Sequence, residues 1–120
     1  RWLMGSVEGF VGRPFEAIRF IGGGAKSTLW CQIFADVLNR PIDQVADPLS
    51  ANVRGAAFVA AVGLGKLEVE EISALVPVAK RYSPDQSNRG TYDELFEAFL
   101  EIQKHSASMY QRLNSGASHG

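Results

Sequence analysis

The sequence contains a single cysteine, Cys31, among its 120 residues. One thiol cannot form a disulfide within the chain, so the reducing cytoplasm is the natural compartment for this protein. Cys31 lies within an amphipathic segment, which favours a small buried apolar side chain over a nucleophile. We therefore expect a cytoplasmic protein whose one thiol has a packing role.

An excess of charge of one sign and long apolar runs are also lacking. Lysine and arginine number 12 against 13 aspartate and glutamate, for a net charge of -1, which gives no reason to expect nucleic acid or an anionic membrane as a partner. No uninterrupted apolar run approaches the roughly 20 residues that a membrane-spanning helix needs. We expect neither kind of partner.

The composition that is present, 46% hydrophobic and 21% charged residues, is ordinary for a globular chain. Its length gives room for one domain. We expect that domain over residues 1–113 and a disordered tail over residues 114–120, which are small and polar. Leu3, Val7 and Phe10 already lie on one helical face at the start of the chain, so we expect a piece of a longer protein.

Apolar periodicity and turn residues predict short strands between helices. Strands are expected at Glu16–Ile21 and Ile42–Val45, followed later by an extended segment at residues 81–85. The near-continuous apolar character of the first strand indicates burial on both faces. Helices are expected over residues 1–11, from Ser27 or Thr28 to about Asn39, over residues 51–65 and 69–75, and from a capping box at Thr91 and Glu94 to about Leu113.

The chain is organised around residues 18–30, where a strand runs into Gly22, Gly23 and Gly24 and then into the most regular of the predicted helices. Glycine has no side chain to block the approach of a ligand, and the N–H groups at a helix start point outward. Small residues along the predicted helix 51–65 also indicate close packing against a neighbour.

Two common phosphate-binding motifs do not fit this glycine run. A P-loop requires glycine at the positions of Phe20 and Ala25. A dinucleotide fingerprint would have its third glycine at Ser27, and the acid near the expected distance, Asp43, lies beside Pro41 instead of ending a convincing strand. From these residues alone, a tight strand–helix turn without a ligand remains an open alternative.

The stretch Phe20-Ile-Gly-Gly-Gly-Ala-Lys-Ser-Thr-Leu-Trp-Cys-Gln-Ile-Phe-Ala-Asp-Val-Leu-Asn-Arg-Pro-Ile42 resembles the C-terminal signature of the FGGY family of carbohydrate kinases, above all its xylulokinase branch. Arg54-Gly-Ala-Ala-Phe-Val-Ala-Ala61 is similar to the family helix that connects the two lobes in actin-like ATPases. Tyr82-Ser-Pro84 and the helix after Tyr92 resemble the family's C-terminal ending, so the likeness runs from about Trp2 to Leu113.

This resemblance implies an α/β fold, namely the C-terminal portion of a ribonuclease-H-like (actin-like ATPase) domain with short strands and flanking helices. It also implies transfer of the ATP γ-phosphoryl group, with Mg²⁺, to a hydroxyl of a xylulose-like ketopentose or a related sugar or polyol. The sugar site, the aspartate base and the phosphate loops lie upstream in the family. We therefore expect no catalytic or metal-binding residue here, and an inactive fragment.

The resemblance carries part of the nucleotide site onto this sequence. Its positions beside the adenosine of ATP are Gly23, Gly24, Ala25, Ser27 and Thr28. Glycerol kinases have asparagine where Thr28 stands, so a hydroxyl replaces an amide there. Asp36 also belongs to the signature, and we interpret it as a surface residue or as the acceptor of a helix-to-loop hydrogen bond.

A hypothesis of a different class is that the chain is a non-catalytic α/β module for binding or oligomerisation. Removal of an upstream lobe would leave apolar surface exposed, at Trp2, Phe58 or the alanine-rich helix. Under either hypothesis a homodimer is a reasonable expectation.

Overall fold

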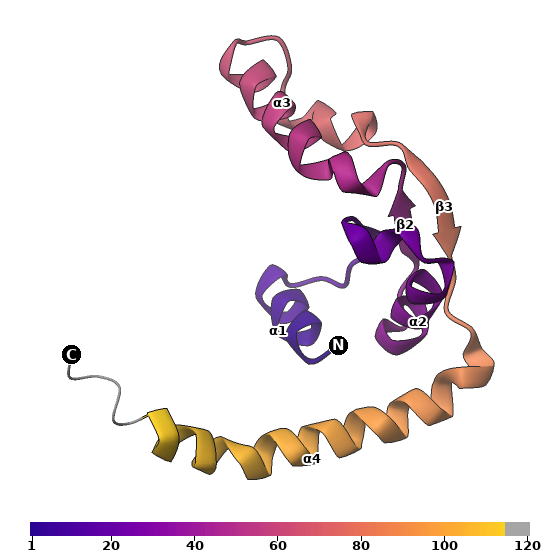
Figure 1. Cartoon of the computed structure of the whole chain (residues 1–120), viewed down its shortest axis with the longest axis vertical. Coiled ribbons are helices and arrows are strands. Elements are labelled where there is room, and N and C mark those ends of the chain that lie inside the picture. Colours follow the sequence, from indigo (N-terminus) through magenta and orange to yellow (C-terminus); the bar gives the residue numbers. More distant parts are fainter. Residues whose placement is uncertain (115–120) are drawn as a thin grey trace. The chain divides into compact units, whose positions relative to one another are not determined.

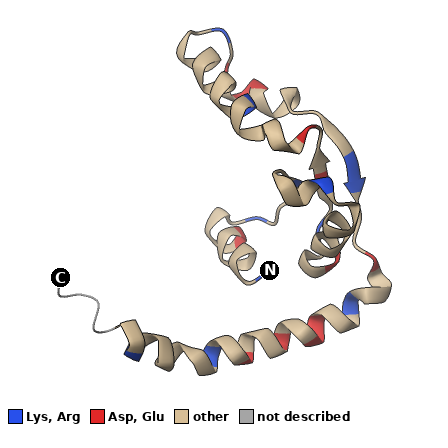
Figure 2. Cartoon of the chain, viewed as in Figure 1, with Lys and Arg blue, Asp and Glu red and all other residues tan. Residues whose placement is uncertain are grey.

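The computed structural model describes residues 1–114. By its internal contacts the chain divides into two units, Arg1–Gln86 and a second one from Ser87 onward, and each is described by itself. Charged residues of both signs occur along both units (Figure 2). The single domain over residues 1–113 stays a prediction. Of the predicted tail, Asn114 ends a helix and residues 115–120 lie outside the described residues.

A three-stranded sheet forms the centre of the first unit (Figure 1). The strands β1 (Ile18–Phe20), β2 (Ile42–Val45) and β3 (Val78–Tyr82) lie in the order β1-β2-β3. β1 is parallel to β2, and β3 is antiparallel to it. Ile42, on the central strand, pairs with Ile18 on one side and with Tyr82 on the other.

The predicted strand Ile42–Val45 is confirmed, and the first strand is shorter than predicted because only three of its residues pair with β2. The expected burial of β1 on both faces is wrong: Arg19 is exposed between the half-buried Ile18 and Phe20. β1 is an edge strand in the described unit, and the Arg19 guanidinium reaches out to donate to the carbonyl of Ser73 at 2.8 Å.

The core lies between the sheet and helix α2 (Thr28–Leu38), which packs beside β2 and β3 (Figure 1). Its buried side chains come from both layers: Cys31, Ala35, Ile42 and Tyr82, with Ile18, Phe20 and Leu38 packed around them. Cys31 is completely buried, which confirms its predicted packing role. Burial also raises the pKa of its thiol, so the thiol stays protonated near neutral pH.

Local capping signals set the ends of α2. The Ser27 hydroxyl accepts a hydrogen bond from the N–H of Trp30 at 3.3 Å, which makes Ser27 the N-cap, one of the two candidates from the sequence. At the other end Asn39 adopts the left-handed conformation with φ 51° and closes the helix before Pro41.

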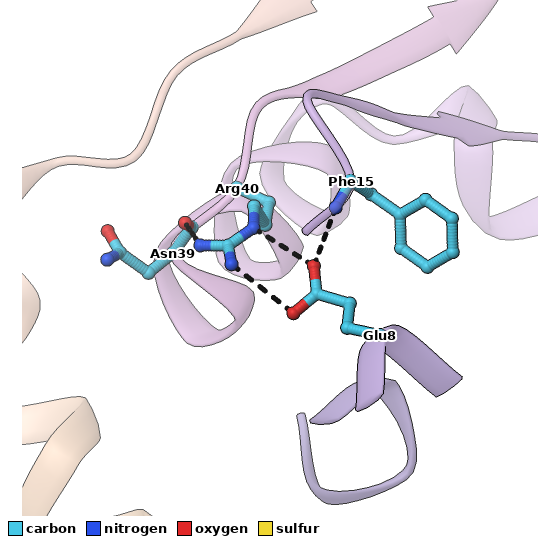
Figure 3. A network of polar contacts seen from close by, with 4 residues as sticks. All are labelled: Glu8, Phe15, Asn39 and Arg40. Carbon is cyan, nitrogen blue, oxygen red and sulfur yellow. Dashed lines mark hydrogen bonds and ion pairs between the residues drawn. The ribbon is translucent and has the colours of Figure 1, made fainter. Parts of the chain in front are cut away.

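Helix α1 (Trp2–Val11) ends at Gly12, whose φ of 76° allows the left-handed cap. One polar network ties it to the end of α2 (Figure 3). The Glu8 carboxylate accepts from the N–H of Phe15 at 2.8 Å and from two nitrogens of Arg40 at 3.3 Å each. Arg40 also donates to the carbonyl of Asn39 at 3.0 Å. Glu8 thus connects α1 to the loop at Phe15, seven residues later, and to Arg40, 32 residues later in the chain.

Replacing Glu8 by glutamine is expected to lower the stability at neutral pH and to flatten its loss in acid. The N–H of Phe15 first, and Arg40 after it, hold the pKa of Glu8 below its ordinary value of 4.5. A carboxylate with a lowered folded-state pKa stabilises the fold above its unfolded-state pKa, and this contribution is lost as the pH falls through the folded-state value. Urea unfolding on either side of that pKa measures the effect. Glu101→Gln, at an exposed position of another helix, serves as the control and should leave the pH dependence of stability unchanged. Identical profiles of stability against pH for Glu8→Gln and wild type would contradict the prediction.

Helix α3 (Ala51–Gly63) and a 3₁₀-helix (Val69–Leu75) complete the first unit. The 3₁₀-helix occupies the predicted range, and a reciprocal capping box between Glu68 and Glu71 starts it. The close packing expected for α3 is wrong for the described unit, since no residue of this helix is buried. Small side chains permit a close neighbour but do not supply one.

The second unit consists of a short 3₁₀ turn and helix α4 (Arg89–Asn114). The predicted capping box is wrong, because the helix begins at Arg89 and Thr91 lies inside it. Arg89 and Asp93 form an ion pair of 2.6 Å across the first turn. Between residues 1 and 114, no helix is both long and apolar enough to cross a membrane.

Candidate functional site

The glycine run forms a turn at the carboxyl end of β1. Gly22 has φ 81° and ψ −171°, a conformation that essentially only glycine adopts. Its N–H donates to the carbonyl of Pro48 at 2.9 Å, which fixes the turn to the segment after β2. A 3₁₀-helix, Gly23–Lys26, then separates the strand from α2. The sequence predicted a direct entry into the helix and did not reveal this extra turn.

Gly23 and Gly24 are both exposed but differ in their surroundings. A Cβ atom at Gly23 would meet no heavy atom within 4 Å, so this backbone is open to an approaching molecule. A Cβ atom at Gly24 would lie 3.2 Å from Cζ of Phe20. Gly24 is therefore required in part by the packing of an aromatic ring, whereas Gly23 has no comparable internal constraint.

Ala25 anchors the turn to the interior of the protein. It is completely buried, its N–H donates to the carbonyl of Gly22 at 3.1 Å, and its carbonyl accepts from the Gln44 side-chain amide. Cys31 adds a weak S–H contact of 3.7 Å to the same carbonyl. Of the five residues predicted to border a nucleotide, Ala25 thus has no exposed surface of its own.

Ser27 and Thr28 complete the predicted set. The Ser27 hydroxyl is occupied as the cap of α2, and the residue is half-buried. Thr28 is exposed, as is Lys26. The structure therefore brings Gly23, Gly24 and Thr28 to one exposed turn. Ala25 and Ser27 stabilise this turn, Ala25 by its burial and backbone hydrogen bonds and Ser27 by capping α2.

Sequence reasoning missed Gln44. Its amide joins the carbonyl of Ala25 to the hydroxyl of Tyr82, which donates to the Gln44 side-chain oxygen at 3.3 Å. A polar residue in a strand whose flanking positions are buried is the signal that could have found it. Gln44 couples the glycine turn to the central and the third strand.

The acidic residues near the turn have structural roles. Asp36 is 5% exposed and accepts from the N–H of Asp85 at 2.7 Å, which confirms the predicted helix-to-loop hydrogen bond. Both carboxylate oxygens of Asp43 accept from Arg81, at 2.6 and 2.7 Å, and this contact holds the pKa of Asp43 below its usual range. Asp43 is therefore engaged within the sheet, which further weakens the dinucleotide interpretation.

An aromatic cluster lies next to the turn. The rings of Phe20 and Phe34 have centroids 4.8 Å apart, and Trp30 follows at 6.0 Å from Phe34. Trp30 is 53% exposed two residues after Thr28. The site thus offers exposed backbone, one hydroxyl and a flat apolar surface, which suit the binding of a planar group. Residues 1–114 contain no group of three side chains placed to hold a metal ion.

The turn lies within a region of the chain that matches a known protein family. The pattern of the FGGY family of carbohydrate kinases, C-terminal domain, matches residues 2–64, which include the whole turn. A xylulose kinase of Staphylococcus epidermidis is 31% identical over 100 residues, covering 82% of this chain and 20% of that protein. An autoinducer-2 kinase of Enterobacter is also 31% identical, over 101 residues, covering 82% of this chain and 19% of that protein.

The similarity extends to three dimensions. The crystal structure of a xylulose kinase from Lactobacillus acidophilus matches 92% of this chain, and 23% of that one, with a TM-score of 0.72 and 27% identity. The chain spans about a fifth of the length of the curated relatives it matches. On the evidence of the matched residues and of the shared actin-like ATPase fold, the chain belongs to the FGGY family of carbohydrate kinases, within the C-terminal domain of that family.

Proposed function

We propose that this chain is the nucleotide-binding part of an ATP-dependent sugar kinase and that its glycine turn borders the adenosine of ATP. The observation that carries the proposal is the exposed backbone of Gly23 and Gly24 at the carboxyl end of β1, within the residues that match the family. Ligands of α/β sheets bind at the carboxyl ends of the strands. Thr28 adds a hydroxyl at the same edge.

The roles within the turn follow from burial. Gly23, Gly24 and Thr28 contact the nucleotide, while Ala25 and Ser27 shape the backbone that they share. Trp30 offers an apolar surface nearby. The phosphoryl step needs charge neutralisation and an oriented hydroxyl. ATP with Mg²⁺ supplies the phosphoryl group in this proposal, and the described residues are not assigned to the metal ion or to the catalytic base.

The substrate class proposed is a xylulose-like ketopentose or a related sugar or polyol, phosphorylated in the cytoplasm. A xylulose kinase and an autoinducer-2 kinase are equally similar to this chain at 31% identity. The nucleotide part therefore carries little information on the acceptor. We place the acceptor site, like the base, in a part of the polypeptide upstream of this chain.

Fluorescence of Trp30 tests the nucleotide site. The sequence has two tryptophans, so Trp2→Phe leaves Trp30, two residues after Thr28, as the only tryptophan reporter. Titration with ATP or ADP should change its emission, and Gly23→Val should weaken binding at least about tenfold, or roughly 1.4 kcal/mol, because the valine side chain occupies the approach to the backbone. The melting temperature should change little, since a Cβ atom at Gly23 meets no neighbour.

Gly5→Val is the matched control, because Gly5 also has no heavy atom within 4 Å of its Cβ position and lies on α1, away from the turn. It should leave nucleotide affinity unchanged. Equal affinities of wild type and Gly23→Val, or no response of Trp30 to millimolar nucleotide, would count against the proposed site.

A further inference from the structure

Gln44 lies on the central strand β2, on the same face as Ile42, two residues earlier. Ile42 belongs to the core that Cys31 of α2 also joins, so this face is turned toward α2. Both ends of the Gln44 amide are engaged there. The NH₂ group donates to the carbonyl of Ala25, and the oxygen accepts from the Tyr82 hydroxyl at 3.3 Å. The side chain therefore bridges β3 and the glycine turn.

The carbonyl of Ala25 depends on this bridge. Ala25 is completely buried, so water does not replace a hydrogen bond that its carbonyl loses. Cys31 is a second donor to the same oxygen, at 3.7 Å, but a thiol is a weak donor. The N–H of Ala25 is held by the Gly22 carbonyl at 3.1 Å. Gln44 thus supplies the strong hydrogen bond that fixes the peptide plane after Ala25, one residue beyond Gly24.

The two partners of the Gln44 amide also define its orientation. A carbonyl oxygen only accepts hydrogen bonds, so the Ala25 carbonyl must face the NH₂ group, and the amide oxygen then faces Tyr82. Tyr82 is the buried residue at the end of β3, whose first four residues are exposed. Its hydroxyl restrains the amide from the opposite side. The position of the Ala25 carbonyl is therefore set by a residue of β2 and a residue of β3.

We propose that Gln44, restrained by Tyr82, is a positioning residue for the nucleotide. It holds the Ala25 carbonyl, and through it the exposed backbone of Gly23 and Gly24, in the conformation that binds adenosine. This inference rests on the proposed function, because it concerns the same site. Without the Gln44 donor the Ala25 carbonyl is left buried with a weak thiol partner, so the turn rotates to bring this carbonyl toward water. Such a rotation displaces Gly24 and the surface offered to the nucleotide.

The first readout is the affinity for ADP, measured by the tryptophan fluorescence of the Trp2→Phe chain. Gln44→Leu removes both the donor and the acceptor and should weaken ADP binding at least about fivefold. Tyr82→Phe removes only a hydroxyl and should weaken it about twofold. Ile42→Val, on the same face of β2, is the matched control. It lowers the stability without removing a hydrogen bond to the turn, and it should leave the affinity unchanged.

The amide signals of the glycines separate positioning from a purely structural role. Selective labelling of glycine with ¹⁵N gives one N–H signal for each of the 12 glycines. In the chain without nucleotide, Gln44→Leu should displace the signals of Gly23 and Gly24 and leave that of Gly5, on α1, in place. Ile42→Val should displace none of the three. A role in stability alone would lower the free energy of unfolding without moving these signals.

The outcomes distinguish this inference from the proposed function. If the wild type responds to millimolar ADP in neither readout, the nucleotide site and the inference both fall. If the wild type binds ADP and Gln44→Leu binds it equally well, or if the signals of Gly23 and Gly24 stay in place, the site stands and Gln44 does not position it. Equal losses of affinity in Gln44→Leu and Ile42→Val would also overturn the inference. Tyr82→Phe decides by the same two readouts if Gln44→Leu does not fold.

Discussion

Replacing Ile42 by alanine is expected to lower the free energy of unfolding by about 2–5 kcal/mol. Ile42 is 1% exposed and is one of the three largest fully buried side chains in the described part of the protein. It lies on the central strand and contacts a core that includes Cys31 and Tyr82. Alanine removes three carbons from a site that the two strands and α2 hold in place, so a cavity remains.

Urea unfolding followed by tryptophan fluorescence measures this effect, since Trp2 and Trp30 both belong to the first unit. Ile42→Val should cost about 0.5–1.5 kcal/mol, which gives a graded series. Leu64→Ala, at a residue that is 74% exposed, should change the stability by less than about 0.5 kcal/mol. If Ile42→Ala were as stable as Leu64→Ala, the core between β2 and α2 would be wrongly assigned.

The features that the sequence predicted best are those with local causes. The cap at Ser27, the end of α2 near Asn39 and the short strand Ile42–Val45 each depend on residues within one turn or one strand. β3 was predicted only from Arg81 onward, although it begins at Val78. Its first four residues are exposed, and their strand conformation comes from pairing with β2, more than 30 residues earlier in the chain. Such pairing leaves no periodic signal within the strand.

In the candidate site, too, the features with local causes were predicted and those set by distant contacts were not. Its place in the sequence followed from the three glycines and the family signature, both of which are local. Which residues face outward did not follow, because the 3₁₀ turn directs Ala25 into the core, where Gln44 from β2 bonds to its carbonyl. The orientation of the turn is therefore set by a contact across the sheet, and sequence spacing cannot reveal it.

Gly22 is the residue on which the conformation of this turn depends most directly. A Cβ atom there would meet no heavy atom within 4 Å, so the cost of Gly22→Ala comes from the backbone alone. With φ 81° and ψ −171°, that cost should be about 1–3 kcal/mol of unfolding free energy. Gly23→Ala is the control, since Gly23 has no positive φ and an equally open surrounding, and it should cost much less.

Substitutions at Gly22 and Gly23 should also differ in their effects when nucleotide affinity is measured together with the free energy of unfolding. Gly22→Ala should weaken both, because the Gly22 carbonyl and N–H hold the turn to Ala25 and Pro48, and a strained turn presents Gly23 and Gly24 differently. Gly23→Val should weaken nucleotide binding and leave the unfolding free energy nearly unchanged. Equal stabilities of Gly22→Ala and Gly23→Ala would contradict the backbone argument. A nucleotide affinity that follows stability alone in both variants would mean that the glycines build the turn without contacting the ligand.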